Sequence, residues 1–325
     1  MASFSPLPII VHRYVNRCQT VAQPPGLADF LKGTVYLYQQ SKRGQASAVA
    51  GAVAVAGASV VAGQAGAEAA AAFVLLVDFS HHPMGVFIQP PTRPLEHQAL
   101  VAAAAPLTEC FNQYRPVIRD IVATIQQTPQ NAPPVTYAIC HEPYDRFDEN
   151  TSVLSTDDQA FMKSVLTFHE ELYELADQIQ EDLGIGKEYV VVHLRMGDQQ
   201  SAHATAYAEQ LNDVMRCLET ELIPRWGKRI LVLSDSYYTK QFLKTKYGLA
   251  CTDFTPVHMG ESARFLNRGQ PASLTEIGHT LTEFILMSRS QAIYIYSVYG
   301  WCSGFSKLAA HIYGIPYISM TPRAT

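Results

Sequence analysis

The sequence lacks the cysteine spacing that builds a zinc cage or a dense disulfide framework. Its six cysteines lie far apart, and no two of them form a Cys-x-x-Cys pair. Closely spaced cysteines and histidines hold structural zinc, and dense sets of cysteines make disulfide scaffolds. Neither is expected here, and no metal site is predicted. Reduced, mostly buried thiols indicate a cytoplasmic location.

An excess of basic residues is also missing. The chain has 24 Lys and Arg against 29 Asp and Glu, which gives a net charge of −5. Proteins that hold nucleic acid through many phosphate contacts are normally basic, so a nucleic-acid partner is not expected. A small anionic ligand needs only a local positive site and remains compatible with this charge.

No convincing membrane segment is present. Residues 44–67 carry no charge, but they consist almost entirely of Ala, Gly, Val and Ser, and two glutamines interrupt them. Small, weakly apolar residues insert poorly, so a low-complexity insert in a soluble domain is favoured over a membrane span. The first residues, MASFSPLPIIVHRY, have no cationic start and only a short apolar patch. They therefore do not indicate a signal peptide.

Several motifs of common nucleotide enzymes are absent. The chain has no G-x-x-x-x-G-K-[ST] phosphate loop, no G-x-G-x-x-G after its first strand and no G-x-S-x-G turn. These absences disfavour NTPases, dinucleotide enzymes and α/β-hydrolases. There is also no D-x-D triplet to hold a metal on a diphosphate. A site for a sugar nucleotide would therefore rely on arginine, serine and helix dipoles.

The pattern that is present is that of an α/β protein. In the second half, apolar strands near 187–195, 229–236, 292–297 and 315–320 alternate with helices near 204–222, 238–246, 274–291 and 303–313. Such alternation predicts a parallel sheet covered by helices on both faces.

The first half is less regular. It contains predicted strands near 7–14 and 72–79, with predicted helices near 27–40, 96–128 and 156–183. A Pro-rich loop, TPQNAPPVTY, separates the last two of these helices. We expect two Rossmann-like domains, 1–186 and 187–325, that face a cleft, with the insert 44–67 in the first.

Polar residues gather where the strands of the second half end. The strand VVVHLR ends at Arg195 and is followed by Met196-Gly197-Asp198, the next strand ends at Ser234-Asp235-Ser236, and the third leads from Ser297 to Ser303. The carboxyl ends of parallel strands meet at one edge of a sheet. Arginine binds phosphate in a bidentate manner, and Ser303 lies at a helix start, which suits a phosphate. A diphosphate is therefore the expected ligand.

Each of these residues also has a structural interpretation. Arg195 could form an ion pair with Asp198, and Asp235 could cap the following helix. The remaining candidates could equally be ordinary turn or core residues: Ser297, Ser303 and His193. Glu283 lies beside the apolar face of the helix 274–291, where a solvated carboxylate is the alternative to a buried one.

The segments VVVHLRMGD, ILVLSDS and TEFILMSRSQAIYIYSVYGWCSGFSKLAAHIYGIPY resemble, in this order, the three motifs of the α1,2/α1,6/protein-O-fucosyltransferase superfamily. PPGLADFLKGTVYLYQQSK, which contains Gly26, resembles the glycine turn and helix near the start of that family. The resemblance implies a GT-B fold, a GDP-fucose donor, inversion at the sugar and no required metal. The partners it implies are a nucleotide-sugar donor and a glycan or glycoprotein acceptor.

The resemblance also implies roles for individual residues. Arg195 falls on the arginine that holds the donor diphosphate, and His193 on the histidine beside the nucleotide. Glu283 falls on the acidic position that reads guanine, and Ser303 lies near the residue that contacts phosphate. The remaining donor-site candidates are strand-end and glycine-turn residues: Gly26, Gly197, Asp198, Asp235 and Ser297.

The chain also departs from the family pattern. Met196 stands where some relatives have a second arginine, and His203 stands where the α1,6 members have a glutamate proposed as a base. A neutral imidazole can accept a proton near neutral pH, so His203 is the candidate general base, and a surface loop histidine is the alternative. A transferase that uses another nucleotide sugar and a non-catalytic glycan- or nucleotide-binding protein remain the alternatives.

Overall fold

The computed structural model describes residues 9–13, 27–28, 30–35, 37–39, 41–42, 74–79, 83–89, 109–111, 135–139, 154–196, 204–254, 257, 272–299 and 302–320. The insert 44–67 and four predicted site residues lie outside these ranges: Gly26, Gly197, Asp198 and His203. Within the described ranges, no helix has the length and apolar character that a membrane crossing requires.

The chain divides into two compact units. The first comprises Met1–Val86 and Pro90–Ser152, and the second comprises Phe87–Gln89 and Val153–Thr325. The first unit contains a parallel sheet in the order β2-β1-β4-β3. Its strands are β1 (Ile9–Arg13), β2 (Val74–Asp78), β3 (Glu109–Phe111) and β4 (Val135–Ile139). The short 3-10 helix η1 (Pro83–Phe87) follows β2 along the chain.

Two strands of the first unit differ from the sequence prediction. β3 lies inside the predicted helix 96–128, and β4 begins within the predicted Pro-rich loop. Both are short, and each depends on pairing with a distant segment rather than on a long local pattern. The helical residues from Leu27 to Lys42 and the strands β1 and β2 agree with the prediction.

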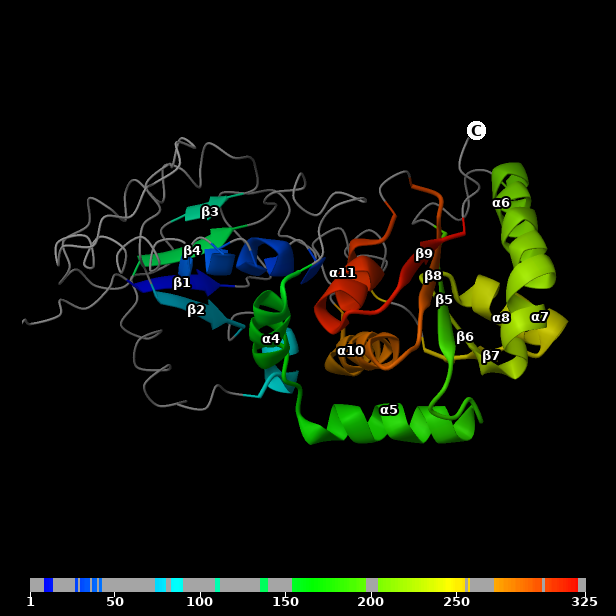
Figure 1. The fold of residues 1–325 in the computed structure, drawn as a ribbon, viewed down its shortest axis with the longest axis horizontal. Coiled ribbons are helices and arrows are strands. Elements are labelled where there is room, and N and C mark those ends of the chain that lie inside the picture. The colour runs from blue at the N-terminus through cyan, green and yellow to red at the C-terminus, as the bar shows by residue number, and fades with distance from the viewer. Residues whose placement is uncertain are drawn as a thin grey trace, which may run out of the picture. The chain divides into compact units, whose positions relative to one another are not determined.

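The second unit is built on a five-stranded sheet in the order β7-β6-β5-β8-β9, and every neighbouring pair is parallel (Figure 1). Its strands are β5 (Val190–Arg195), β6 (Ile230–Ser234), β7 (Ala250–Cys251), β8 (Ile293–Ser297) and β9 (Tyr317–Ser319). The chain moves from β5 outward to β7 and then crosses to β8 on the other side. The strand order therefore reverses between β5 and β8, as in a doubly wound fold. This confirms the predicted α/β class.

Helices cover both faces of this sheet, as Figure 1 shows. The helices of the described part of the second unit are α4 (Thr156–Val165), α5 (Glu170–Asp182), α6 (Ala204–Cys217), the π-helical turn η3 (Leu218–Leu222), α7 (Ile223–Trp226), the short turn η4 (Gly227–Arg229), α8 (Tyr237–Tyr247), α10 (Leu274–Ser288) and α11 (Gly304–Tyr313). In Figure 1, α10 and α11 lie on one side of β5 and β8, and α6 and α7 lie on the other.

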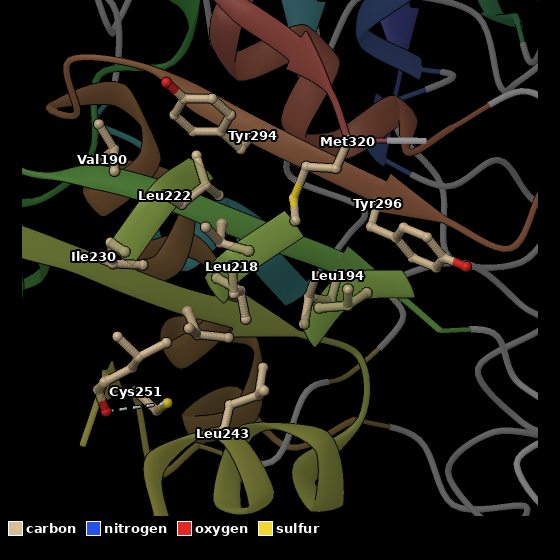
Figure 2. Packing of buried hydrophobic residues seen from close by; sticks show 14 of the residues in the cluster. Val190, Leu194, Leu218, Leu222, Ile230, Leu243, Cys251, Tyr294, Tyr296 and Met320 are labelled. Carbon is tan, nitrogen blue, oxygen red and sulfur yellow. Dashed lines mark hydrogen bonds between the residues drawn. The ribbon is translucent and has the colours of Figure 1, made fainter. Parts of the chain in front are cut away.

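Side-chain alternation along β5 assigns its residues to the two faces. Val190, Val192 and Leu194 belong to a buried cluster with Leu218 and Leu222 of the α6 side (Figure 2). Successive side chains of a strand point to opposite faces. The odd-numbered residues of β5, which include His193 and Arg195, therefore face α10 and α11.

The predicted helix 156–183 is two helices, and both belong to the second unit. Between them, Phe168 is fully buried and pairs with Ile88 through an isolated bridge. α4 packs on α11, with Gln159 Nε2 donating to the backbone oxygen of His311 at 3.1 Å, and α5 packs on α10. The long segment of the second unit begins at Val153, whereas the sequence pattern indicates a boundary near Gly184–Lys187.

The helix α10 begins with a capping box. Ser273 Oγ accepts the backbone N–H of Glu276 at 3.2 Å, and the Glu276 carboxylate accepts the backbone N–H of Ser273 at 2.7 Å. Ser273→Ala should lower the free energy of unfolding by about 1 kcal/mol, because one helix N–H loses its partner. Urea unfolding measures this change. A loss of several kcal/mol would show that Ser273 supports more than this one hydrogen bond.

Candidate functional site

The carboxyl ends of β5, β6 and β8 bring three of the predicted site residues to one edge of the sheet: Arg195, Asp235 and Ser297. Arg195 lies opposite Ser297 in the β5–β8 register, and Leu194 lies opposite Ser234 in the β5–β6 register. Asp235 follows Ser234 directly. Arg195 and Ser297 therefore stand where the strand order reverses, which is where open α/β sheets bind their ligands.

Asp235 holds both the side chain and the backbone at the end of β5. Its Oδ2 forms an ion pair with Arg195 Nη1, and its Oδ1 accepts the backbone N–H of Met196 at 2.8 Å. Both side chains are largely buried, with 18% and 19% of their surfaces exposed. The alternative that Asp235 caps the next helix is wrong, because Ser236 accepts the N–H of Thr239 and caps α8. The partner of Arg195 that the structure shows is Asp235, and Asp198 lies outside the described residues.

Further hydrogen bonds fix the loops around this ion pair. Ser234 Oγ donates to the backbone oxygen of Leu194 at 2.8 Å and accepts the N–H of Ser236 at 3.0 Å. On the other side, Ser297 Oγ accepts the N–H of Tyr299 at 3.1 Å, so Ser297 does stabilise a turn. The Arg195 guanidinium lies 5.5 Å from the centre of the Tyr299 ring, within range of a cation–π contact.

Ser303 is the residue immediately before α11. It is 6% exposed, and its side chain makes no capping hydrogen bond to the helix. The first N–H groups of a helix lack intrahelical acceptors and carry partial positive charge. The start of α11 and the Ser303 hydroxyl therefore form an environment that suits a phosphate oxygen.

His193 is buried on the same face of the sheet as Arg195. Its Nδ1 has no hydrogen-bond partner among the described residues, although most buried polar atoms have one. Burial lowers the pKa of His193 to about 4, the Glu283 carboxylate offsets part of this shift, and Arg195 and Lys240 add to it. The imidazole is therefore neutral at neutral pH. A core histidine whose Nδ1 is hydrogen-bonded within the protein was the alternative, and the described residues provide no such bond. A group of a bound ligand could supply a hydrogen bond to Nδ1.

Stability should depend on pH through His193. The pKa of His193 lies below the ordinary value of 6.5, so the unfolded chain binds this proton more readily between about pH 6.5 and 4. The contribution of a neutral His193 to the free energy of unfolding is fully present above pH 6.5 and is lost as the pH falls from about 6.5 to 4. His193→Asn should remove up to about 3 kcal/mol of this pH dependence. Urea unfolding of both proteins from pH 4 to 7 tests this, and parallel curves would contradict it.

Glu283 projects from α10 and is 8% exposed. Its Oε1 accepts the hydroxyl of Thr252 at 2.6 Å and the ammonium of Lys240 at 3.3 Å. The alternative of a solvated glutamate at the helix edge is therefore wrong. Sequence reasoning missed Lys240 and Thr252, because a lysine on a helix is normally exposed and nothing in the local pattern marks this one as buried.

In the described parts of the chain, no three side chains of His, Cys, Asp or Glu come together as a metal site would require. The polar groups that do meet at the sheet edge are one arginine, one aspartate, serine hydroxyls and backbone N–H groups. This set suits an anion such as a phosphate.

The fold is α/β and of the GT-B type, and it is similar to that of fucosyltransferase structures. The fucosyltransferase NodZ from Bradyrhizobium matches with a TM-score of 0.51 and 12% sequence identity, over 93% of this chain and 91% of that one. NodZ α-1,6-fucosyltransferase soaked with GDP-fucose matches with a TM-score of 0.53 and 12% identity, over 94% and 92% of the two chains. The same enzyme co-crystallised with GDP gives a TM-score of 0.52, 12% identity and coverage of 93% and 91%. No protein-family model matches the sequence, and no curated protein is significantly similar to it.

Proposed function

We propose that this protein is an inverting fucosyltransferase that moves L-fucose from GDP-fucose to a hydroxyl group of a glycan or protein, without a required metal ion. The observation that carries the proposal is Arg195, which Asp235 holds at the reversal point of the sheet. The similarity to NodZ structures soaked with GDP-fucose or crystallised with GDP supports the choice of donor.

Arg195 would stabilise the departing diphosphate. When the bond between the sugar and the phosphate oxygen breaks, negative charge grows on the diphosphate. A guanidinium can contact two phosphate oxygens at once and remains charged at every relevant pH. Asp235 fixes its orientation before the reaction, so little reorganisation is needed as the charge develops.

The remaining site residues of the second unit would bind the other parts of the donor. The start of α11, with Ser303, would accept a phosphate oxygen. His193, neutral and with an unpartnered Nδ1, would hydrogen-bond to the nucleotide. Glu283 would accept hydrogen bonds from the N–H groups of guanine, which uracil does not offer in the same arrangement.

The acceptor side of the reaction needs only modest help. Sugar transfer passes through an oxocarbenium-like transition state, in which the electrophile already carries positive charge. The acceptor hydroxyl must lose its proton as it attacks, and His203 remains our candidate for the base. In this scheme the bond from the sugar to the acceptor oxygen forms as the bond to the diphosphate oxygen breaks.

A nucleotide screen tests the proposal and separates it from its alternatives. Thermal unfolding with GDP, UDP and ADP should show the largest stabilisation with GDP, because ligand binding raises apparent stability by mass action. Purified protein with GDP-fucose should then release GDP, and faster in the presence of an accepted glycan. Stabilisation by UDP or ADP alone would indicate another donor. Binding of GDP without any turnover across a broad acceptor panel would indicate a non-catalytic binding protein.

A further inference from the structure

Lys240 is a fully buried lysine within the second unit. It lies on α8 and its side chain has no exposed surface. A buried ammonium is costly unless hydrogen bonds and an opposite charge compensate it. The structure supplies three acceptors for its three N–H donors: Thr252 Oγ1 at 2.9 Å, the backbone oxygen of Phe254 at 3.0 Å and Glu283 Oε1 at 3.3 Å.

Thr252 connects the other two members of this group. Its hydroxyl accepts from Lys240 and donates to Glu283 Oε1 at 2.6 Å. Because a hydroxyl has a single hydrogen, these two bonds fix its orientation. Lys240, Thr252 and Glu283 come from α8, the residue after β7, and α10, so the cluster joins three separate elements.

The two carboxylate oxygens of Glu283 differ in their hydrogen bonding. Oε1 accepts from both Lys240 and Thr252, which uses its two lone pairs. No described residue donates a hydrogen bond to Oε2. Oε2 is not among the buried atoms that lack a partner, so solvent or a ligand can reach it. Its two lone pairs are sufficient for two N–H donors on one edge of a base.

Stability alone does not explain this arrangement. A buried ion pair often contributes no more to stability than a pair of apolar side chains of similar volume. Two apolar residues at positions 240 and 283 would also pack between α8 and α10. What the pair adds is a fixed carboxylate with one oxygen that makes no hydrogen bond to a described residue.

We propose that Lys240 and Thr252 are positioning residues that anchor Glu283 through Oε1 and present Oε2 as the acceptor that selects guanine. This inference rests on the proposed function, because it requires that Glu283 faces the base. It predicts that two residues outside the donor contacts set the preference for guanine. It also predicts that the exocyclic amine of guanine matters, because Oε2 accepts from both N1–H and N2–H.

The test measures affinities for GDP, IDP and UDP by calorimetry in the full-length protein. IDP lacks the exocyclic amine, and UDP lacks the purine edge. The wild type should bind GDP most tightly, IDP more weakly and UDP weakest. Lys240→Met and Thr252→Val should each weaken GDP by about ten- to a hundred-fold, the range of a charge-assisted hydrogen bond. UDP affinity should stay within two- to three-fold of the wild type, about the error of such comparisons.

Lys244→Met is the matched control. Lys244 lies one turn further along α8 and forms an exposed ion pair with Asp253, the neighbour of Thr252. This variant should keep the order and size of all three affinities. Thr252→Val removes only a hydroxyl, so it provides the test if Lys240→Met does not fold.

The outcomes separate this inference from the proposed function. A wild type that binds UDP as tightly as GDP would remove the proposed function and this inference together. If the wild type prefers GDP, and the variants fold and keep the same ratio of GDP affinity to UDP affinity, only this inference is contradicted. Lys240 would then be a counter-ion with a structural role. Equal weakening of all three nucleotides would lead to the same conclusion.

Discussion

Replacement of Arg195 by alanine is expected to lower the turnover of GDP-fucose by about a hundred- to a thousand-fold. In the proposed reaction, the guanidinium is lost at the point where charge would develop on the leaving diphosphate, and such contacts are typically worth about 3–4 kcal/mol. Affinity for GDP should also fall, because the product carries the same diphosphate. Arg195→Lys should recover only part of either quantity, since an ammonium cannot contact two oxygens as a guanidinium does. Initial rates of GDP release measure the effect.

Two variants keep this prediction specific. Arg289→Ala is the matched control: Arg289 pairs with Asp177 at 2.7 Å and lies just before the amino end of β8, so its loss should leave turnover unchanged. The ion pair with Asp235 raises the opposite possibility, that Arg195 serves only to hold β5 and β6 together. If Arg195→Ala unfolds, and exchange of the two residues restores both folding and GDP affinity, the arginine is a structural support and the catalytic role is wrong.

Glu283→Gln should change nucleotide selectivity more than any other substitution on α10. Glutamine keeps an oxygen for Lys240 and Thr252 in place of Oε1, but it puts an amide NH₂ in place of Oε2, the proposed acceptor for guanine. The N–H groups of guanine would then meet another donor. Affinity for GDP should fall by about 2–4 kcal/mol, the range for a lost charged hydrogen bond and an unpaired polar group. Affinity for UDP should change little, and calorimetry with both nucleotides gives the comparison.

The choice of glutamine follows from the structure. Both substitutions remove the charge of Glu283, but Glu283→Ala would also leave Lys240 and Thr252 without the acceptor oxygen that glutamine supplies, at a cost of about 1–3 kcal/mol of stability for each buried donor. Loss of GDP binding by that variant would therefore not distinguish recognition from unfolding. Equal losses for GDP and UDP in a folded Glu283→Gln protein would show that Glu283 supports the fold and does not read the base.

The sheet of the second unit is largely predictable from the sequence. β5, β6 and β8 are continuous apolar runs bounded by turn residues, and the helices between them have clear starts, such as the Ser273 capping box of α10. Parallel order follows from the alternation of strands and helices. The polar residues at the strand ends could then be placed on one edge, which correctly brought Arg195, Asp235 and Ser297 together.

The pairing of those residues was not predictable in the same way. Arg195 and Asp235 are forty positions apart, so only the β5–β6 register makes them neighbours. Asp198 was the nearer carboxylate in sequence and therefore the simpler expectation. Lys240 presents the same difficulty, because its burial depends on β7 and α10, two elements that its own helix does not reveal. Local patterns predict elements, whereas partners between elements depend on tertiary contacts.

The hydrogen bonds at the ends of β5 and β6 have a consequence for binding. Asp235 Oδ1 accepts the backbone N–H of Met196, so the two strands stay connected one residue beyond the end of β5. Ser234 Oγ donates to the backbone oxygen of Leu194 and adds a second bond between the same strand ends. These bonds are internal to the protein, so they need no ligand to form. The sheet edge is thus preorganised. Under the proposed function, a donor that docks here would immobilise few additional torsions, and little conformational entropy would oppose its binding. Most of the interaction energy of the diphosphate would then lower the barrier to sugar transfer.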